Sequence, residues 1–481
     1  MKMTFPRTSI AAALALLLSA CMVGPDYHRP PVPVPVKYKE LDGWTQAEPA
    51  ATAPKGDWWT AFDDPLLDRL EPMIAVSNQT VRQDYANYQE ALAEVRVANS
   101  SLFPTIGATG STVRQRYSSA QTTTGRGIVN SGALEGTVSW APDIWGQVRR
   151  EIEENAATAQ ASEATLANAA LSEQVTLATS VIGLRITDAN IDLLQQTVKA
   201  YQDYLRVVGD QQQAGTVPPS DLITAQTQLE SAQSSLIALG VSRAQYEHAI
   251  AVLVGKNPED LDVPHSTALP TLPSIPVGMP STLLQRRPDI AVAERQMAAE
   301  NAAIGVAVAA YYPTISLSAA AGFTESPLAG LLNISNYVWS LGGSASETIF
   351  DGGYRNAEVA VAKAAYDSAL ANYRGTVLTA FEDVENDLAG LRILADQAKV
   401  LDAEVKDATR GAQIALNEYQ AGTVDYTTVA TAQTTQLSAE ETALSVESTR
   451  LIDAVTLIGD LGGGWSADEL CDARHAKCAK K

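Results

Sequence analysis

The chain has 481 residues, of which 46% are hydrophobic but only 6% aromatic, and its formal net charge is −21 at pH 7. This composition suits long, closely packed helices better than a thick aromatic core, and an acidic chain without a basic patch is a poor nucleic-acid binder. The four histidines lie far apart, and no His-Glu-x-x-His, Gly-x-Ser-x-Gly, Walker or Gly-x-Gly-x-x-Gly motif is present. We therefore expect no enzyme, no cofactor, no metal site and no nucleic-acid partner.

The N-terminus has the pattern of a secretion signal. Basic residues precede an apolar run, 10–18, that is too short to span a bilayer and leads into Leu18-Ser-Ala-Cys21. We expect residues 1–20 to be a signal peptide. The last four residues resemble a bacterial lipobox, which implies that Cys21 is acylated; the alternative is an ordinary signal with an incidental cysteine. Met22, in place of the Asp associated with inner-membrane retention, implies sorting to the outer membrane.

Residues 21–56 are rich in proline. Such a segment favours an extended, polyproline-like conformation and has little to bury. We expect it to be a tether between the lipid and the folded body.

A first repeat is predicted over residues 57–270. It begins with a helix at 65–102, with Asn78 or Thr80 as a possible internal restart, and the Pro104 motif ends this helix. Apolar and polar side chains then alternate over 134–140, which predicts a strand. We expect a β-hairpin at 104–144, although 104–117 alternates poorly and a polar loop is predicted over 118–131. A long helix then runs from Gly146 to about Gly209, and a second helix returns over 219–255.

A second repeat over 271–465 has the same order of elements, and a tail, 466–481, follows it. A helix is predicted for 289–310, a β-hairpin for 313–350, and a returning helix for 426–461. The turn Ala421-Gly-Thr-Val424 repeats Ala214-Gly-Thr-Val217 at an offset of 207 positions. Each turn indicates a helix end, a left-handed Gly and a restart. Apolar residues at three-four spacing along the long helices predict coiled-coil seams.

The two hairpins pose a physical problem. Ser, Thr and Gly on one face and apolar residues on the other suit a wet lumen within lipid, although a soluble sheet also alternates. Four strands cannot close a barrel, and an open edge facing lipid is not tolerated. Two chains would give eight strands around a filled interior, whereas three would give twelve around a passage. A conduit therefore predicts a trimer.

Two groups of residues leave alternatives open. Glu382, Asp383, Glu385 and Asp387 form an acidic group on a predicted helix, either a solvated face or a lumen-facing band. Cys471 and Cys478, in an exported protein, allow a local disulfide, two free thiols or, least favoured, a metal site with His475.

Several motifs together resemble the TolC/OprM outer-membrane factors, in their lipoprotein, NodT-like branch. The motifs are Cys21 after Leu-Ser-Ala, the two Ala-Gly-Thr-Val turns, Leu284-Gln-Arg-Arg-Pro-Asp-Ile290, Tyr312-Pro-Thr-Ile-Ser316, Ile349-Phe-Asp-Gly-Gly353 and Leu461-Gly-Gly-Gly-Trp465. The resemblance implies a mainly α fold with a membrane β-barrel: a homotrimer whose 12-stranded β-barrel in the outer membrane continues into a long α-helical coiled-coil barrel in the periplasm. It also implies a tripartite pump, in which a periplasmic adaptor (membrane fusion protein) and an inner-membrane transporter, of RND type, deliver substrates to this passive exit duct.

The resemblance also implies functional positions. The family pinches its helices at the periplasmic end and places rings of carboxylates there, which favour cations. Where the second repeat of the family carries a gate Asp, this chain has Thr428 and Thr431, so that ring is absent. Asp221, at the position equivalent to Thr428, is the leading gate candidate, with a helix-capping role as the alternative, and Asp425 is a second candidate. Adaptor contact is expected at the two turns, through Gly215, Thr216, Gly422 and Thr423. In the strands, an aromatic girdle at the membrane surface is expected, with core packing of the hairpins as the alternative; its residues are Tyr337, Trp339 and Trp140.

A structural coiled-coil lipoprotein without conduction is the competing hypothesis. It shares the anchor and the heptads but gives no reason for two amphipathic hairpins at matched positions. A cell-envelope enzyme is disfavoured because no catalytic group of residues is visible.

Overall fold

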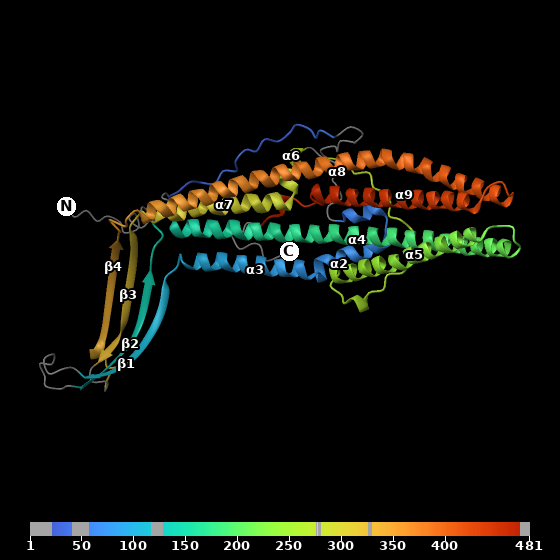
Figure 1. Cartoon of the computed structure of the whole chain (residues 1–481). Coiled ribbons are helices and arrows are strands. Elements are labelled where there is room, and N and C mark those ends of the chain that lie inside the picture. Colours follow the sequence, from blue (N-terminus) through green and yellow to red (C-terminus); the bar gives the residue numbers. More distant parts are fainter. Residues whose placement is uncertain are drawn as a thin grey trace.

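The computed structural model describes residues 22–40, 57–116, 128–275, 277, 280–325 and 330–471. The predicted signal peptide, Cys21 and Cys478 lie outside these ranges. The chain is a long rod of helices with a four-stranded sheet at one end and helical turns at the other (Figure 1). We call the helical turns at the far end the tip.

The helices occur in matched pairs, as the duplication predicts. The two long helices, α4 (Gln147–Gln213) and α8 (Tyr354–Gln420), have 67 residues each, about 100 Å at 1.5 Å per residue. Their returning partners, α5 (Pro219–Leu253) and α9 (Tyr426–Asp460), have 35 residues each. Among the described residues, no helix is both long and apolar enough to cross a membrane.

The shorter helices brace the sheet end and the middle of the rod. They are α2 (Pro65–Ser77), α3 (Gln79–Ser100), α6 (Pro280–Arg286) and α7 (Pro288–Ala309). The predicted restart near Asn78 is confirmed: Asn78 ends α2 and caps α3, since its side-chain oxygen accepts the Val81 N–H at 3.1 Å. The described part of the chain also contains four 3₁₀ turns: Trp58–Phe62, Pro258–Asp260, Ile334–Asn336 and Ala467–Glu469.

The four strands form one antiparallel sheet in the order β1-β2-β3-β4. Their bounds are Thr105–Arg116, Ile128–Trp140, Thr314–Glu325 and Tyr337–Ser346. The weakly alternating first strand is therefore real, and the predicted polar loop is too long because β2 begins at Ile128. The register gives the sheet two faces, since Leu134 pairs with Phe323 and Ala321 with Trp339 on one face. Ser139 pairs with Ser318 on the other.

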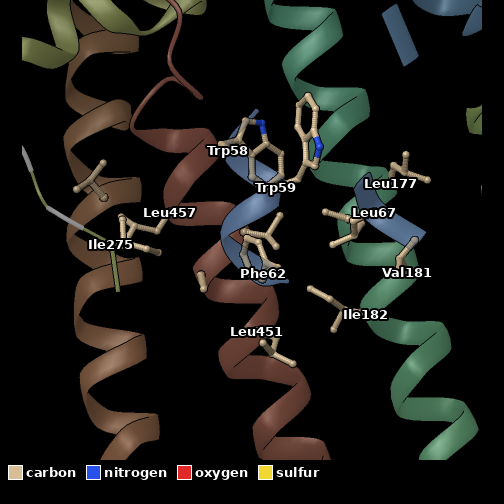
Figure 2. Packing of buried hydrophobic residues seen from close by; sticks show 14 of the residues in the cluster. Trp58, Trp59, Phe62, Leu67, Leu177, Val181, Ile182, Ile275, Leu451 and Leu457 are labelled. Atoms are coloured by element: carbon tan, nitrogen blue, oxygen red, sulfur yellow. The ribbon is translucent and has the colours of Figure 1, made fainter. Parts of the chain in front are cut away.

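The main core lies in the middle of the rod, where both repeats meet. Trp58, Trp59 and Phe62 enter it from a short 3₁₀ turn and lie between α4 and α9 (Figure 2). The Thr271 N–H donates to the Phe62 carbonyl at 2.8 Å, which fastens this turn to the connection between the repeats. The aromatic turn therefore joins the two halves of the chain.

Residues 22–40 lie extended along the outside of the rod, and we call them the N-terminal strap. Arg150, 1% exposed, donates to the carbonyls of Val23 and Gly24 at 3.0 and 3.1 Å. At the other end Tyr38 is 1% exposed in the core, and Glu385 accepts the next two backbone N–H groups at 2.6 and 3.0 Å. This part of the expected tether is therefore docked along the helices, with Tyr38 as its one buried residue among 22–40.

The C-terminal end of the described chain is also tied to α4. The Cys471 N–H donates to Glu163 at 2.8 Å, and its carbonyl accepts from Gln160 at 2.9 Å. Cys471 is disulfide-bonded, so the alternative of two free thiols does not fit the structure.

Candidate functional site

The two turns at the tip have the same backbone geometry. Gly215 and Gly422 adopt φ +73° and +70°, the left-handed conformation that glycine reaches without strain. The N–H and the hydroxyl of Thr216 both donate to the Gln211 carbonyl at 2.9 Å, and Thr423 does the same to Glu418. Each turn thus satisfies the last carbonyls of its long helix, and Gly215, Thr216, Gly422 and Thr423 are all exposed there.

Replacing Gly422 by alanine is expected to loosen this turn. A Cβ would meet no atom within 4 Å, so the cost is the left-handed strain alone, about 1–2 kcal/mol. Amide exchange over residues 418–428 should become about 5–30 times faster. Gly411→Ala is the matched control, because this glycine is exposed within α8 with open space around it, and alanine favours a helix by about 1 kcal/mol. Equal exchange changes in both variants would contradict this account.

The capping aspartate at the tip is Asp425. Its carboxylate accepts the Thr428 N–H at 3.0 Å and the Thr428 hydroxyl at 2.9 Å, and the N–H bond holds the pKa of Asp425 below its usual range. In the first repeat the capping residue of α5 is Pro218, and no side chain makes a capping bond. The alternative role of Asp221 as a helix cap is therefore wrong. Thr428 is exposed, as is Thr431, whose hydroxyl bonds the Thr427 carbonyl.

Asp221 lies in the first turn of α5 and is only 6% exposed. It faces the neighbouring hairpin, since it is one of the causes, after burial, that raise the pKa of Tyr419. In the single chain, its carboxylate therefore lies between the two hairpins and not on an open surface.

Around Asp221 the hairpins α4–α5 and α8–α9 share a small apolar cluster. We call it the tip cluster; its buried members are Val208, Ala225, Tyr426, Val429 and Ala430. The rings of Tyr419 and Tyr426 meet edge to face with centroids 5.6 Å apart. The hydroxyls of both tyrosines donate hydrogen bonds to side chains of the first repeat.

These hydroxyls form what we call the tyrosine–glutamine bridge. Tyr419 Oη donates to Gln211 Oε1 at 2.5 Å, and Tyr426 Oη to Gln228 Oε1 at 3.3 Å. The amide of Gln228 donates in turn to the Ala430 carbonyl at 3.2 Å. Burial raises the pKa of both tyrosines, so they remain neutral donors. The bridge ties the two hairpins together beside the turns.

The sequence did not point to this bridge. Its residues have no counterpart at the matched offset of 207 positions, where Tyr419 corresponds to Gln212 and Tyr426 to Pro219. The available signal was two tyrosines flanking one turn in a chain with few aromatics.

The predicted girdle residues lie at two levels of the sheet. Trp140 ends β2 beside the helices, and its indole N–H donates to the Leu102 carbonyl at 3.0 Å. Tyr337 and Trp339 begin β4 at the far end, and all three are exposed. The helix–sheet connections add further exposed side chains: Phe103, Ile349, Phe350 and Tyr354.

The acidic group on α8 differs from both expectations. Only Glu382 is exposed. Asp383 pairs with Arg287 at 3.3 Å, Glu385 binds the strap, and burial is the main cause that raises the pKa of Asp387. The group therefore makes contacts within the chain, halfway along the rod.

Comparison with known proteins gives consistent results along the chain. The family described as outer membrane efflux protein matches residues 72–256 and 279–463. TtgC of Pseudomonas putida, a probable efflux pump outer membrane protein, is 30% identical over 463 residues, covering 94% of this chain and 95% of TtgC.

Two solved structures are similar over almost the whole fold. The outer-membrane channel OprN has a TM-score of 0.86 at 29% identity, covering 92% of this chain and 100% of that one. The open state of the MtrE outer membrane channel of Neisseria gonorrhoeae has a TM-score of 0.83 at 26% identity, covering 93% and 99%.

Proposed function

Because this chain belongs to the outer membrane efflux protein family, we propose that it is the outer-membrane exit duct of a tripartite efflux or secretion system. It conducts substrates passively, and a constricted periplasmic end controls the passage. A periplasmic adaptor and an inner-membrane transporter, of RND type, are the proposed partners. The relative TtgC is described as an efflux pump component, which supports this role.

The observation that carries the proposal is the two-faced sheet. Its apolar face suits lipid and its Ser/Thr-rich face suits water. Within the described ranges, β1 and β4 each pair on one side only. Because an open edge is costly in a membrane, copies of the chain must close the sheet. Three copies supply twelve strands, enough for a passage.

Acylation of Cys21 agrees with where the strap begins. The Val23 N–H donates to the Trp145 carbonyl at 3.1 Å, and Met22 lies against Gly146 so closely that a Cβ on this glycine would clash. Residue 22 therefore lies beside the connection between sheet and helix. A lipid on the preceding residue would enter the membrane at the level where Trp140 and the exposed connection residues lie.

We propose that the closed end is the tip and that the tyrosine–glutamine bridge helps to hold it closed. Asp221 acts within this contact, whereas Asp425, Thr428 and Thr431 offer exposed polar groups on the adjoining turn of α9. The exposed glycines and threonines of the two turns are the proposed adaptor contact. An open state of the related MtrE channel supports the idea that such a duct changes conformation.

Conductance of the purified protein in planar bilayers tests the proposal. We expect a trimer by native mass spectrometry and small, discrete currents that require the protein. Trimers that give no current, even when Tyr419 and Tyr426 of the bridge are both replaced by phenylalanine, would favour the structural lipoprotein. Monomers in a detergent that preserves the fold would contradict the proposed closure by copies.

A further inference from the structure

Halfway along the rod, one buried arginine joins three helices. Arg287, 8% exposed, precedes the first residue of α7 and pairs with Asp289 at 2.8 Å. It also reaches Asp383 of α8 at 3.3 Å and Asp460 of α9 at 3.1 Å. A single guanidinium therefore faces three carboxylates from three elements.

Two further carboxylates face this group from the contact between α8 and α9. Asp387 lies close to Asp460 and Asp453, whose charges raise its pKa, and its carboxylate oxygen Oδ2 is buried without a hydrogen-bond partner among the described residues. A Cβ on Gly390 would stand 2.9 Å from an oxygen of Asp453, so α8 approaches α9 closely here. We call Arg287 with these five carboxylates, from Asp289, Asp383, Asp387, Asp453 and Asp460, the carboxylate node.

Among the described residues, the other surrounding elements supply no second cation to these carboxylates. The strap contributes Tyr38, whose pKa is raised by burial and by Glu385. A cavity of about 410 Å³ lies against Arg287 and Asp460, and α4 lines it with Ser172 and Thr176 among others. Five carboxylates therefore share one guanidinium.

With five carboxylates around one guanidinium, at least one carboxyl group is expected to carry a proton. Ionised carboxylates can only accept hydrogen bonds, so a bond between Asp387 and Asp460 needs one of them to be protonated. Burial, followed by the charges of Asp460, Asp453 and Asp383, raises the pKa of Asp387 to about 8. Burial also raises that of Asp460, against the opposing effect of Arg287.

The node lies near the end of the dense core that faces the tip. On α8 the core includes Val384, Leu388 and Leu391, and on α9 it includes Leu451 and Val455. Between this level and the tip cluster, α8 is mostly exposed in the single chain, with Leu401 and Ala412 among its few buried side chains. We call residues 392–415 with their α9 partner the ribbon; it begins just beyond the node, where Arg392 still pairs with Glu40 of the strap at 2.6 Å.

We propose that the proton shared by Asp387 and Asp460 fastens α8 to α9 at the root of this ribbon, and that its loss at alkaline pH loosens the α8–α9 hairpin. In the duct proposed above, on which the functional consequence rests, a looser hairpin weakens the closure of the tip. The duct would leak more at alkaline pH.

The direction follows from the protonation states. An acid whose folded pKa lies above its ordinary value favours the protonated form in the folded state, so its contribution to stability falls as the pH rises above the ordinary value and is lost by about pH 8. Asp387 therefore ionises at a more alkaline pH than an ordinary aspartate does. Two ionised carboxylates in contact, with Asp453 and Asp383 beside them, repel each other.

Hydrogen exchange of residues 392–415 at pH 7 and pH 9, corrected for the intrinsic exchange rates, tests directly whether the proton shared by Asp387 and Asp460 holds the ribbon. We expect about tenfold faster exchange at pH 9 in the wild type. Asp387→Asn should remove this response, because an amide stays neutral and can still donate to Asp460. Asp396→Asn is the control, since Asp396 is an exposed partner of Lys399 on the same ribbon and should leave the wild-type response intact.

Asp460→Asn provides a second variant in case Asp387→Asn does not fold, and it should also remove the response. Equal pH responses in the wild type and in either node variant would overturn the proposed role of the shared proton. That result would leave the duct function untouched, because conductance at pH 7 tests the duct separately. Absence of conductance at pH 7, with the exchange response intact, would overturn the duct function and leave the role of the shared proton standing.

Discussion

Replacing Glu71 by glutamine is expected to stabilise the helical body by about 3 kcal/mol at pH 7, or roughly 1.4 kcal/mol for each pH unit above the ordinary value. Glu71 lies in α2 with 0% exposure, and neither of its carboxylate oxygens has a hydrogen-bond partner among the described residues. Burial raises the pKa of Glu71 to about 9. A neutral amide of the same shape avoids the cost of holding a proton that water would remove.

The sign of the pH dependence identifies the cause. Because the folded state prefers protonated Glu71, wild-type stability is greatest in acid and falls as the pH rises from about 4.5 to about 9. Urea unfolding followed by helical circular dichroism at pH 5, 7 and 8.5 should show this fall in the wild type and a flatter profile in Glu71→Gln. Asp68→Asn, an exposed change on the same helix, should keep the wild-type slope. Parallel profiles for all three proteins would rule out Glu71 as the source.

The repeated order of helices and strands could be predicted from the sequence because it depends on local signals. A glycine turn at matched positions predicts both helix reversals, and the period-two pattern predicts three of the four strands. The fourth strand, β1, has weak alternation but lies beside β2 along its whole length. Pairing with a neighbour decided its structure where its own pattern did not.

Contacts between distant segments account for what the sequence did not predict. The strap has the composition of a linker, yet Arg150 and Glu385, far away along the chain, bind its backbone. The same holds for the tyrosine–glutamine bridge, whose partners lie about 200 positions apart in sequence. No local periodicity encodes such pairs. Glu71 is similar, because its helical position gives no sign that both oxygens are buried.

Replacing Tyr419 and Tyr426 together by phenylalanine is expected to raise the mean current of the duct at least tenfold. The rings and their packing remain, but both hydroxyl donors to Gln211 and Gln228 are lost. Each lost bond costs about 1 kcal/mol or more, because the glutamine oxygen is left without its partner. About 2 kcal/mol per chain shifts a closed–open equilibrium roughly thirtyfold, and three chains add their effects.

Tyr354→Phe is the matched control, because Tyr354 is exposed at the opposite end of α8, beside the sheet. It should leave the current unchanged. An unchanged current in the double variant, in samples confirmed as trimers, would remove the bridge from the gate.

Asp221→Ala separates two ways in which the tip could control passage. A lumenal carboxylate ring would act as a filter, so its removal would change the preference for cations over anions and leave the open probability alone. A carboxylate held between the hairpins, 6% exposed and beside Tyr419, contributes to their contact, so its removal would raise the open probability. The burial of Asp221 favours the second result. We therefore expect a larger current at unchanged ion selectivity, weaker than the effect of the double phenylalanine variant.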